Sequence, residues 1–494
     1  MSSLADLLAG LGAQVTGDPA TPVSSICYDS RAVRAGALFV ALRGGRSDGH
    51  RHLRAALDAG AHSLLVEDVQ GVPSGARAVA RVADTRRALA DVAARFHGRP
   101  GDALRLIGVT GTNGKTSTVR MIESILTHAG VSAGSLGTVS VRYAGREEPA
   151  QLTTPDAPEL QATLRRMLNE GVTHVAMEVS SHSLASERVR GLRFGVAVFT
   201  NLTQDHLDFH GDLTAYGNAK ARLFGSEYLS GGTAIVNARD PLAAQLAREA
   251  RTAGARVLRY DRGKDSDAEI RTLAEDVGLA GSRLAVETPA GSGELDLPLP
   301  GDFQIENALA ALGAGCALGL EWDVLRAGLE KCPPVPGRLE RVSAAEPAVF
   351  VDYAHTPDAL DRVLGRVRAL CRGRLICVFG CGGDRDRSKR VPMARAACRH
   401  ADHVIATSDN PRTEDAGAIL REIAQGLAGS SEVIEDRRAA IARAIELAAP
   451  HDVVVIAGKG HEDYQIIGTE RRHFDDREEA RAALAARAAR EQST

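Results

Sequence analysis

The feature that most constrains this chain is the segment GVTGTNGKTSTVR, Gly108 to Arg120, which lies between an apolar run and an amphipathic pattern. Its glycines let backbone N–H groups approach a phosphate, and a following helix N-terminus favours negative charge. Lys115 can reach the outer phosphates, and Thr116 can ligate magnesium. The general P-loop pattern, G-x-x-x-x-G-K-[ST], has glycine where this chain has Val109. Only the shorter spacing G-x-x-G-K-T, which begins at Gly111, is present. The segment predicts a nucleotide-binding loop.

Apolar runs alternate with helical patterns from this segment onward. The helix expected after Asn113 places Val119, Ile122 and Leu126 on one face, as an amphipathic helix does. The apolar runs are LRLIGV, HVAMEV, VAVF, TAIV, AVFVDY, RLICVFG, HVIAT and DVVVIAG. Short apolar runs separated by helices are typical of parallel sheets. We therefore predict an α/β protein with mostly parallel sheets.

Proline and glycine interrupt the periodic pattern at two places, HGRPGD near residue 99 and KCPPVPGR near residue 335. A length of 494 residues is also consistent with about three domains. We expect domains at 1–99, 100–335 and 336–494.

Charge and cysteine content narrow the class of partner. The formal net charge is -3, with 44% hydrophobic and 25% charged residues, so nothing indicates binding to nucleic acid or to an anionic membrane. The seven cysteines are odd in number and form no C-x-x-C pair, which favours reduced thiols. No signal peptide or membrane span is expected. These patterns predict a cytoplasmic protein with a small-molecule partner.

Two polar side chains follow the strands expected after the nucleotide loop. Ligands of open α/β sheets lie beyond the carboxyl ends of the strands. Glu178 ends HVAME, where it could help to hold magnesium beside Thr116, or could be a capping residue. His206 lies in the polar loop LTQDHLDFHG, where a metal or phosphate contact and a structural role are both open.

Eight motifs occur together in one order: TGTNGKTS, MEVSSHSL, TNLTQDHLDFHG, AYGNAKARLF, VPGRLERV, DYAHTPDAL, GCGGDRDRSKR and SDNPRTED. With DSRAVRAGALFVALRGGRSDGH near the N-terminus, they resemble the Mur ligase family of cell-wall synthesis over nearly the whole chain. The resemblance implies an N-terminal UDP-sugar-binding domain, a central P-loop ATPase domain and a C-terminal Rossmann-like domain for an amino acid.

Within that family the motifs resemble those of ligases that join meso-2,6-diaminopimelate to UDP-N-acetylmuramoyl-L-alanyl-D-glutamate. The resemblance implies that ATP phosphorylates the D-glutamyl γ-carboxylate and that an amine then attacks the acyl phosphate. ATP and Mg²⁺ are the expected cofactors. We expect a monomer, without nucleic acid and without membrane insertion.

The resemblance also assigns catalytic and nucleotide-binding residues. The expected ATP-binding residues are Gly111, Thr112, Asn113, Gly114, Lys115, Thr116, Ser117, Asn307, Arg338 and Asp352. The expected catalytic residues are Lys115, Glu178, His206 and Lys220, of which the last is carbamylated in the family. Thr116, Glu178, His206 and carbamylated Lys220 are the expected metal ligands. From its residues alone, AYGNAKARLF would place Lys220 on a solvated helix face.

Two further sets concern the substrates. For the UDP-muramoyl dipeptide the resemblance points to Tyr28, Ser30, Gly45, Arg46, Ser47, Thr153, Thr154, Ser180, Ser186 and Arg188. Ser186 stands where relatives often have glutamine. For diaminopimelate it points to Arg385, Asp409, Asn410, Pro411, Arg412, Gly458 and Glu462.

Arg412 suits a distal carboxylate and Glu462 suits an ammonium. Read alone, DNPR is better explained as a structural Asx-type turn, with Asn410 restricted by Pro411. Relatives that add lysine lack arginine at this place, so the resemblance favours diaminopimelate.

Four alternatives remain at this stage. One is a ligase of the same family that adds L-lysine, and another is folylpolyglutamate synthase, which lacks the first domain. A non-catalytic ATP-binding sensor would not need the whole set of Lys115, Thr116, Glu178, His206 and Lys220. A dinucleotide oxidoreductase rests only on the irregular glycines of GCGGDRD.

Overall fold

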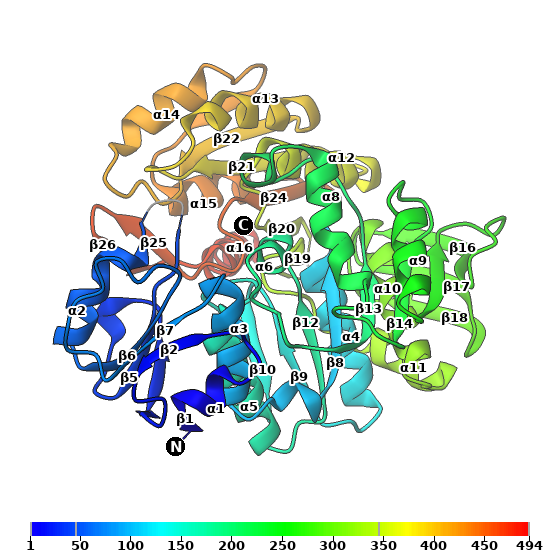
Figure 1. The fold of residues 1–494 in the computed structure, drawn as a ribbon. Helices are drawn as coiled ribbons and strands as arrows, with labels where there is room; N and C mark the ends of the chain where they lie inside the picture. The colour runs from blue at the N-terminus through cyan, green and yellow to red at the C-terminus, as the bar shows by residue number, and fades with distance from the viewer. Residues whose placement is uncertain (1, 45–46, 344–345, 493–494) are drawn as a thin grey trace.

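The computed structural model describes residues 2–44, 47–343 and 346–492, which form three principal sheets, each with its own helices (Figure 1). The mixed α/β class with mostly parallel sheets is confirmed. All seven cysteines are free. No helix in the described parts of the chain has the length and apolarity needed to cross a membrane.

The N-terminal sheet has five strands and is parallel except at β2. Its order is β2 (Gln14–Gly17), β7 (Ala78–Arg81), β6 (Ala61–Val66), β5 (Ala37–Val40) and β4 (Ser25–Cys27). Its helices are α1 (Leu4–Leu8), α2 (Leu53–Asp58) and α3 (Thr85–Phe96). A separate short pair joins β1 (Ser2–Ser3) to β3 (Pro22–Val23).

The central sheet has eleven strands, and its middle strands are parallel. Its order is β11 (Arg146–Pro149), β10 (Ser140–Tyr143), β9 (Ala133–Leu136), β12 (His174–Glu178), β8 (Arg105–Thr110), β13 (Phe194–Phe199), β14 (Thr233–Asn237), β15 (Arg256–Asp261), β16 (Ile270–Gly278), β17 (Gly281–Thr288) and β18 (Gly291–Leu297). The outer pairs, at β10 and β11 and at β17 and β18, are antiparallel. The strands β12, β8 and β13 are therefore adjacent, and their carboxyl ends meet at one edge.

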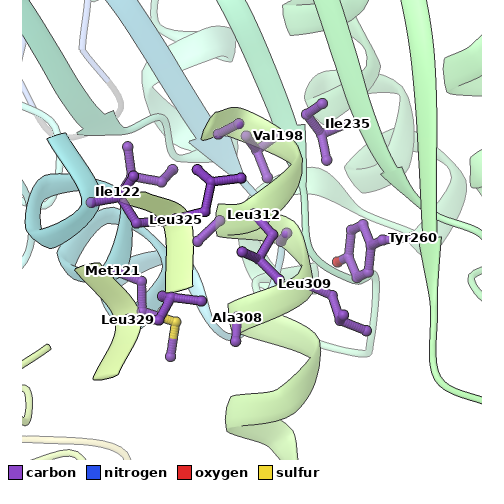
Figure 2. Packing of buried hydrophobic residues seen from close by; sticks show 14 of the residues in the cluster. Met121, Ile122, Val198, Ile235, Tyr260, Ala308, Leu309, Leu312, Leu325 and Leu329 are labelled. Atoms are coloured by element: carbon purple, nitrogen blue, oxygen red, sulfur yellow. The ribbon is translucent and has the colours of Figure 1, made fainter. Parts of the chain in front are cut away.

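The central helices are α4 (Lys115–His128), α5 (Ala157–Asn169), α6 (Ser181–Ala185), α7 (Leu207–His210), α8 (Leu213–Ala221), α9 (Ala243–Thr252), α10 (Phe303–Ala317) and α11 (Trp322–Glu330). Figure 2 shows α4, α10 and α11 packed together against the sheet through fully buried side chains such as Ile122, Leu312 and Leu325. The expected apolar face of the helix after the nucleotide loop is confirmed, because Val119, Ile122 and Leu126 are all buried. This packing fixes the start of α4 at the carboxyl edge of the sheet.

The C-terminal sheet has six strands in the order β19 (Glu340–Arg341), β20 (Ala348–Asp352), β24 (Val453–Ala457), β21 (Leu375–Cys381), β22 (His403–Ser408) and β23 (Ser431–Val433). Only β19 is antiparallel to its neighbour. The helices are α12 (Pro357–Leu370), α13 (Arg390–His400), α14 (Ala416–Ala424), α15 (Arg437–Leu447) and α16 (Asp476–Gln492). The hairpin of β25 (Tyr464–Ile467) and β26 (Glu470–His473) stands apart from this sheet.

Specific polar contacts join the three units. Tyr28 of the N-terminal unit donates to Asp156 Oδ2 at 3.3 Å and lies 3.2 Å from Glu159 Oε1, both near the start of α5. From α12 of the C-terminal unit, Arg362 Nη1 donates to Thr203 Oγ1 of the central unit at 3.1 Å. The latter contact reaches the loop that follows β13.

We expect Leu312→Ala to destabilise the central unit by about 2–5 kcal/mol, because the side chain is fully buried where α10 meets α4. The only tryptophan of the chain, Trp322, packs against the same cluster and reports its unfolding by fluorescence in urea. Leu273→Ala is the matched control, since Leu273 is 41% exposed and its loss should change stability by about 0.5 kcal/mol or less. Equal effects of the two variants would contradict this account of the core.

Candidate active site

The loop between β8 and α4 requires glycine at two positions. Gly111 and Gly114 have φ values of 148° and 85°, which side chains rarely adopt. A Cβ at Gly111 would lie 1.9 Å from Thr200 Oγ1, and one at Gly114 would lie 2.3 Å from Asn307 Oδ1. The first N–H groups of any α-helix lack intrahelical partners, and α4, which begins at Lys115, has no side-chain cap to accept from them. Such a helix start is suited to bind a phosphate.

Two lysine ammonium groups meet at one carbonyl in this loop. Lys115 Nζ and Lys220 Nζ each donate to Gly111 O at 2.9 Å, and Lys115 also donates to Thr112 O at 2.8 Å. Burial lowers the pKa of both lysines, and for Lys220 the nearby Lys115 lowers the pKa further, to well below its ordinary value. The close pair of cations favours loss of a proton from Lys220.

Lys220 is only 1% exposed, so the expectation of a solvated lysine from its residues alone is wrong. Its Nζ lies 4.2 Å from the centroid of the Tyr216 ring, one helical turn earlier on α8. Tyr216 itself is 1% exposed, so this face of α8 points into the protein. The helix has no apolar stripe that would reveal the buried face in the sequence.

Glu178 ends β12 beside the nucleotide loop and is 1% exposed. Its Oε1 accepts from Thr138 N at 2.7 Å, and its Oε2 accepts from Thr138 Oγ1 at 3.0 Å. Glu178 and Thr116 both line a small cavity, as does Gly137. The two residues expected to hold magnesium therefore border a shared space.

His206 lies in an aromatic cluster at the start of α7, with its side chain 48% exposed. Its ring centroid is 4.7 Å from that of His182 and 6.1 Å from that of Tyr216. Burial, and then the neighbouring His206 and His210, lower the pKa of His182 to about 4. This cluster is adjacent to Lys220 through Tyr216, so the loop after β13 and the helix α8 form one wall.

Residues expected to bind the UDP-muramoyl substrate form a hydrogen-bonded group between the N-terminal and central units. Thr154 Oγ1 donates to Glu178 O at 2.9 Å and accepts from Ser180 N at 3.2 Å. Arg188 Nη1 donates to Thr154 O at 2.9 Å, and its Nε lies 2.8 Å from Asp156 Oδ1. Asp156 is also the residue that Tyr28 contacts.

The other residues expected to bind the UDP-muramoyl substrate lie on several different loops and turns. Thr153 Oγ1 lies 3.1 Å from Thr138 Oγ1, which continues the group toward Glu178. Ser30 begins a short 3₁₀ turn, and Ser47 Oγ lies 3.1 Å from His52 Nε2. Ser186 follows the last residue of α6 and is half-buried. Gly45 and Arg46 lie outside the described residues.

Three residues expected near ATP come from α10 and from the start of the C-terminal unit. Asn307 packs against Gly114, and its Nδ2 donates to Gln304 Oε1 at 2.9 Å. Arg338 lies 5.0 Å from the Tyr353 ring centroid. Asp352 accepts from two backbone N–H groups at 2.7 and 2.8 Å, and burial raises the pKa of its carboxyl group.

A second group of polar side chains lies where β22 and β24 end. Asn410 Nδ2 donates to Glu462 Oε2 at 2.8 Å, which joins the loop after β22 to the loop after β24. Gly458 has a φ of 117°, and a Cβ there would lie 2.8 Å from Asp409 Oδ2. The DNPR segment thus belongs to a group of contacts between two strand ends, beyond the local turn that its sequence predicts.

The two arginines of this group form no ion pair with a carboxylate among the described residues. Arg412 has a φ of 53°, and its Nη1 donates to Gly383 O at 2.8 Å. Pro411 lies against the same glycine, in the loop that carries Arg385. Arg385 is exposed on the loop after β21. Both cations remain able to bind a carboxylate.

Sequence reasoning did not single out three residues of these groups: Thr138, Tyr216 and Lys459. Tyr216 could have been found from its spacing of four residues before Lys220, which puts both on one helix face. Lys459 lies between Gly458 and Glu462 and was equally visible. No local signal marks Thr138, whose role depends on contact with a distant strand.

Three family descriptions match the chain in order. They are "Mur ligase family, catalytic domain" at residues 22–97, "Mur ligase middle domain" at residues 109–315, and "Mur ligase, glutamate ligase domain" at residues 337–460. Together they span most of the chain. The chain belongs to the Mur ligase family.

Curated Mur ligases match it over nearly their whole length. A UDP-N-acetylmuramoyl-L-alanyl-D-glutamate--2,6-diaminopimelate ligase of Gloeobacter violaceus is 47% identical over 494 residues, which is 99% of each chain. The ligase of that name from Geobacter metallireducens is 45% identical over 492 residues, covering 95% of each. A solved structure with the same name is 36% identical, covers 98% of this chain and 99% of that one, and has a TM-score of 0.72.

In this Mur ligase a fully buried ion pair supports the second group of side chains. Arg437 Nη2 lies 2.7 Å from Asp476 Oδ2, and both side chains are 0% exposed. The same guanidinium donates to Ala457 O at 3.0 Å and to Ser408 O at 3.4 Å, which are the last carbonyls of β24 and β22. Arg437 therefore holds the two strand ends from which the Asp409 and Gly458 loops begin.

We expect Arg437→Met to destabilise the C-terminal unit by about 3–5 kcal/mol, because it leaves the Asp476 carboxylate buried without its cation. Arg438→Met is the control: Arg438 joins the same two helices through Glu479 but is 70% exposed, so its loss should cost about 1 kcal/mol or less. Urea unfolding followed by circular dichroism measures both. Similar losses in the two variants would mean that burial of the pair is unimportant.

Proposed function

We propose that this Mur ligase joins meso-2,6-diaminopimelate to the D-glutamyl γ-carboxylate of UDP-N-acetylmuramoyl-L-alanyl-D-glutamate at the expense of ATP, in peptidoglycan precursor synthesis. The observation that carries the proposal is similarity over 99% of both chains to a ligase named for these two substrates. The domain limits at 99 and 335, a cytoplasmic location and a monomeric state belong to the same proposal.

The loop after β8 would hold the ATP phosphates. Support comes from two obligatory glycines, an uncapped helix start and Lys115, which are the parts that a phosphate cradle needs. We assign Gly111, Thr112, Asn113, Gly114, Lys115, Thr116 and Ser117 to this cradle. Asn307 packs directly on the loop, and Arg338 and Asp352 would complete the nucleotide site at the start of the C-terminal unit.

The residues present fit a magnesium ion in part. Thr116 and Glu178 line one cavity, and hard oxygen ligands of this kind suit Mg²⁺. Within the described residues no three His, Cys, Asp or Glu side chains are grouped to hold a metal ion. A carbamate on Lys220 would supply a further carboxylate, with His206 as its companion. When bound, the metal ion would neutralise phosphate charge.

The chemistry of Lys220 favours that modification. A neutral amine adds through its nitrogen lone pair to the carbon of carbon dioxide, and loss of one proton leaves a carbamate anion. Burial and the adjacent Lys115 lower the pKa of Lys220 well below its ordinary value, which favours the neutral amine that this addition requires. The carbamate would then place an anion beside the Lys115 cation, where protonated Lys220 would place a second cation.

The ligation would proceed in two displacements. An oxygen of the D-glutamyl γ-carboxylate attacks the terminal phosphorus of ATP, and the bond to the ADP oxygen breaks. A neutral amine of diaminopimelate then attacks the acyl carbon, phosphate leaves with the bonding electrons, and the nitrogen loses a proton. The cationic Lys115 and the loop N–H groups would stabilise the charge on the transferred phosphoryl group.

Two separate sets of residues would bind the UDP-muramoyl dipeptide and diaminopimelate. Tyr28, Ser30, Gly45, Arg46, Ser47, Thr153, Thr154, Ser180, Ser186 and Arg188 would bind the UDP-muramoyl dipeptide between the first two domains. Support comes from the chain of contacts that runs from Tyr28 through Asp156 to Arg188 and Thr154. Arg385, Asp409, Asn410, Pro411, Arg412, Gly458 and Glu462 would bind diaminopimelate, with the guanidinium of Arg412 on a carboxylate.

The deciding experiment is phosphate release from ATP with purified protein. We expect release to require both the UDP-muramoyl dipeptide and meso-diaminopimelate, with L-lysine supporting at most a few per cent of that rate. Lys115→Ala should lower kcat by about a thousandfold or more, because it removes the cation of the phosphate loop. Equal rates with L-lysine would reject the assigned acceptor, and release without any acceptor would reject ligation.

The Lys220 assignment predicts a dependence on carbon dioxide. Activity should fall severalfold in carbon-dioxide-free buffer and return when bicarbonate is added, because the carbamate forms reversibly. Lys220→Ala should be inactive in both buffers, while Lys220→Glu, which places a carboxylate nearby, should retain a small activity that does not respond to bicarbonate. A Lys220→Ala enzyme with normal activity would contradict the assignment.

A further inference from the structure

A buried ammonium group lies between the loops that follow β22 and β24, which carry Asn410 and Glu462 and are called the acceptor loops below. This group has no role in the mechanism above. Lys459 follows β24, and its side chain is 0% exposed. Its Nζ donates to Asn410 Oδ1 at 3.3 Å and to Tyr464 O, and lies 3.4 Å from Glu462 Oε2. An ammonium group has three N–H donors, so these contacts use all of them.

The contact with Lys459 determines how the Asn410 amide is oriented. Its Oδ1 accepts from Lys459 Nζ and from Ile466 N at 2.9 Å, while its Nδ2 donates to Glu462 Oε2. Reversing the amide would direct an NH₂ group at the ammonium and at a backbone N–H, with no acceptor between them. Asn410 is 2% exposed, so water cannot compensate for that loss.

The same ammonium leaves the two oxygens of Glu462 unequal. Oε2 accepts hydrogen bonds from both Asn410 Nδ2 and Lys459 Nζ. Oε1 accepts no hydrogen bond from any residue that the structure describes, and the side chain is 18% exposed. A largely buried carboxylate is costly unless it is paired, and Lys459 provides that pair. Glu462 therefore presents one oxygen in a fixed direction.

We propose that Lys459 is the positioning residue of the acceptor site: it fixes Asn410 and Glu462 together and leaves Glu462 Oε1 to receive an ammonium group of the acceptor amino acid. The inference rests on the proposed function, because it concerns the same pocket. A site whose polar groups are already oriented loses less freedom when the ligand binds. Lys459 thus contributes to acceptor affinity without touching the reacting atoms.

A purely structural lysine would behave differently. It would lower the stability of the C-terminal domain and affect all substrates alike, or none. A positioning residue changes the KM for the amino acid far more than kcat, and it leaves the KM values for ATP and the UDP-muramoyl dipeptide unchanged. Its effect also depends on Glu462, since that carboxylate is the group it orients.

The test uses the full-length enzyme in the phosphate-release assay. We expect Lys459→Met to raise the KM for meso-diaminopimelate at least tenfold, with kcat changed less than threefold. In a Glu462→Gln background the same substitution should raise that KM less than twofold further, because its target is already lost. Arg374→Met is the control, since it breaks the 2.8 Å pair with Asp452 at the opposite end of the same sheet and should leave this KM unchanged.

Each outcome is decisive. A KM for the amino acid within twofold of wild type, or equal increases in the two backgrounds, overturns the role of Lys459. If Lys459→Met does not fold, Lys459→Gln keeps a hydrogen-bond donor and gives the same comparison; failure of both to fold also overturns the proposal, because the lysine would then support the whole domain. A wild-type enzyme inactive with diaminopimelate would instead reject the proposed function.

Discussion

The carbonyl of Gly111 is the point on which the central site depends. Two lysines from distant parts of the chain donate to it, one from the start of α4 and one from the buried face of α8. The arrangement is possible because β12, β8 and β13 are neighbours and end at one edge of the sheet. The packing of α4 against α10 holds that edge, so a core far from solvent determines where the charged groups meet.

The acceptor loops after β22 and β24 are held in place by buried, paired charges. Their backbone ends are held by the Arg437–Asp476 pair, and their side chains by Lys459, all three of which are fully buried. Buried charges are expensive, and they persist here because each has an opposite charge and further hydrogen bonds. Arg412 and Arg385 differ from them, since neither forms an ion pair with a carboxylate among the described residues. Arg437, Asp476 and Lys459 therefore stabilise the loops, whereas Arg385 and Arg412 are available to bind a carboxylate of a ligand.

Much of the fold could be predicted from sequence, because parallel strands and their helices carry local periodic signals. The α/β class and the family are confirmed, and the helix after the nucleotide loop buries the expected face. The roles of the site residues and the limits at 99 and 335 stay predictions. Sequence alone misjudged the exposure of Lys220 and gave no sign of the Arg437–Asp476 pair, and sequence reasoning passed over Lys459 although it stands between two predicted residues. Those features depend on contacts between residues that are remote in the chain or on a helix without an apolar stripe.

The contact between Arg362 and Thr203 has a consequence for how the sites communicate. The hydroxyl that Arg362 contacts also accepts from Asn113 Nδ2 at 3.3 Å, so one side chain is shared by α12 and the nucleotide loop. A ligand that displaced Asn113 would change the free energy of this contact with the C-terminal unit, and linkage would require the contact to change the affinity for that ligand by the same factor. Thr203 is therefore the side chain through which a displacement of Asn113 would reach α12.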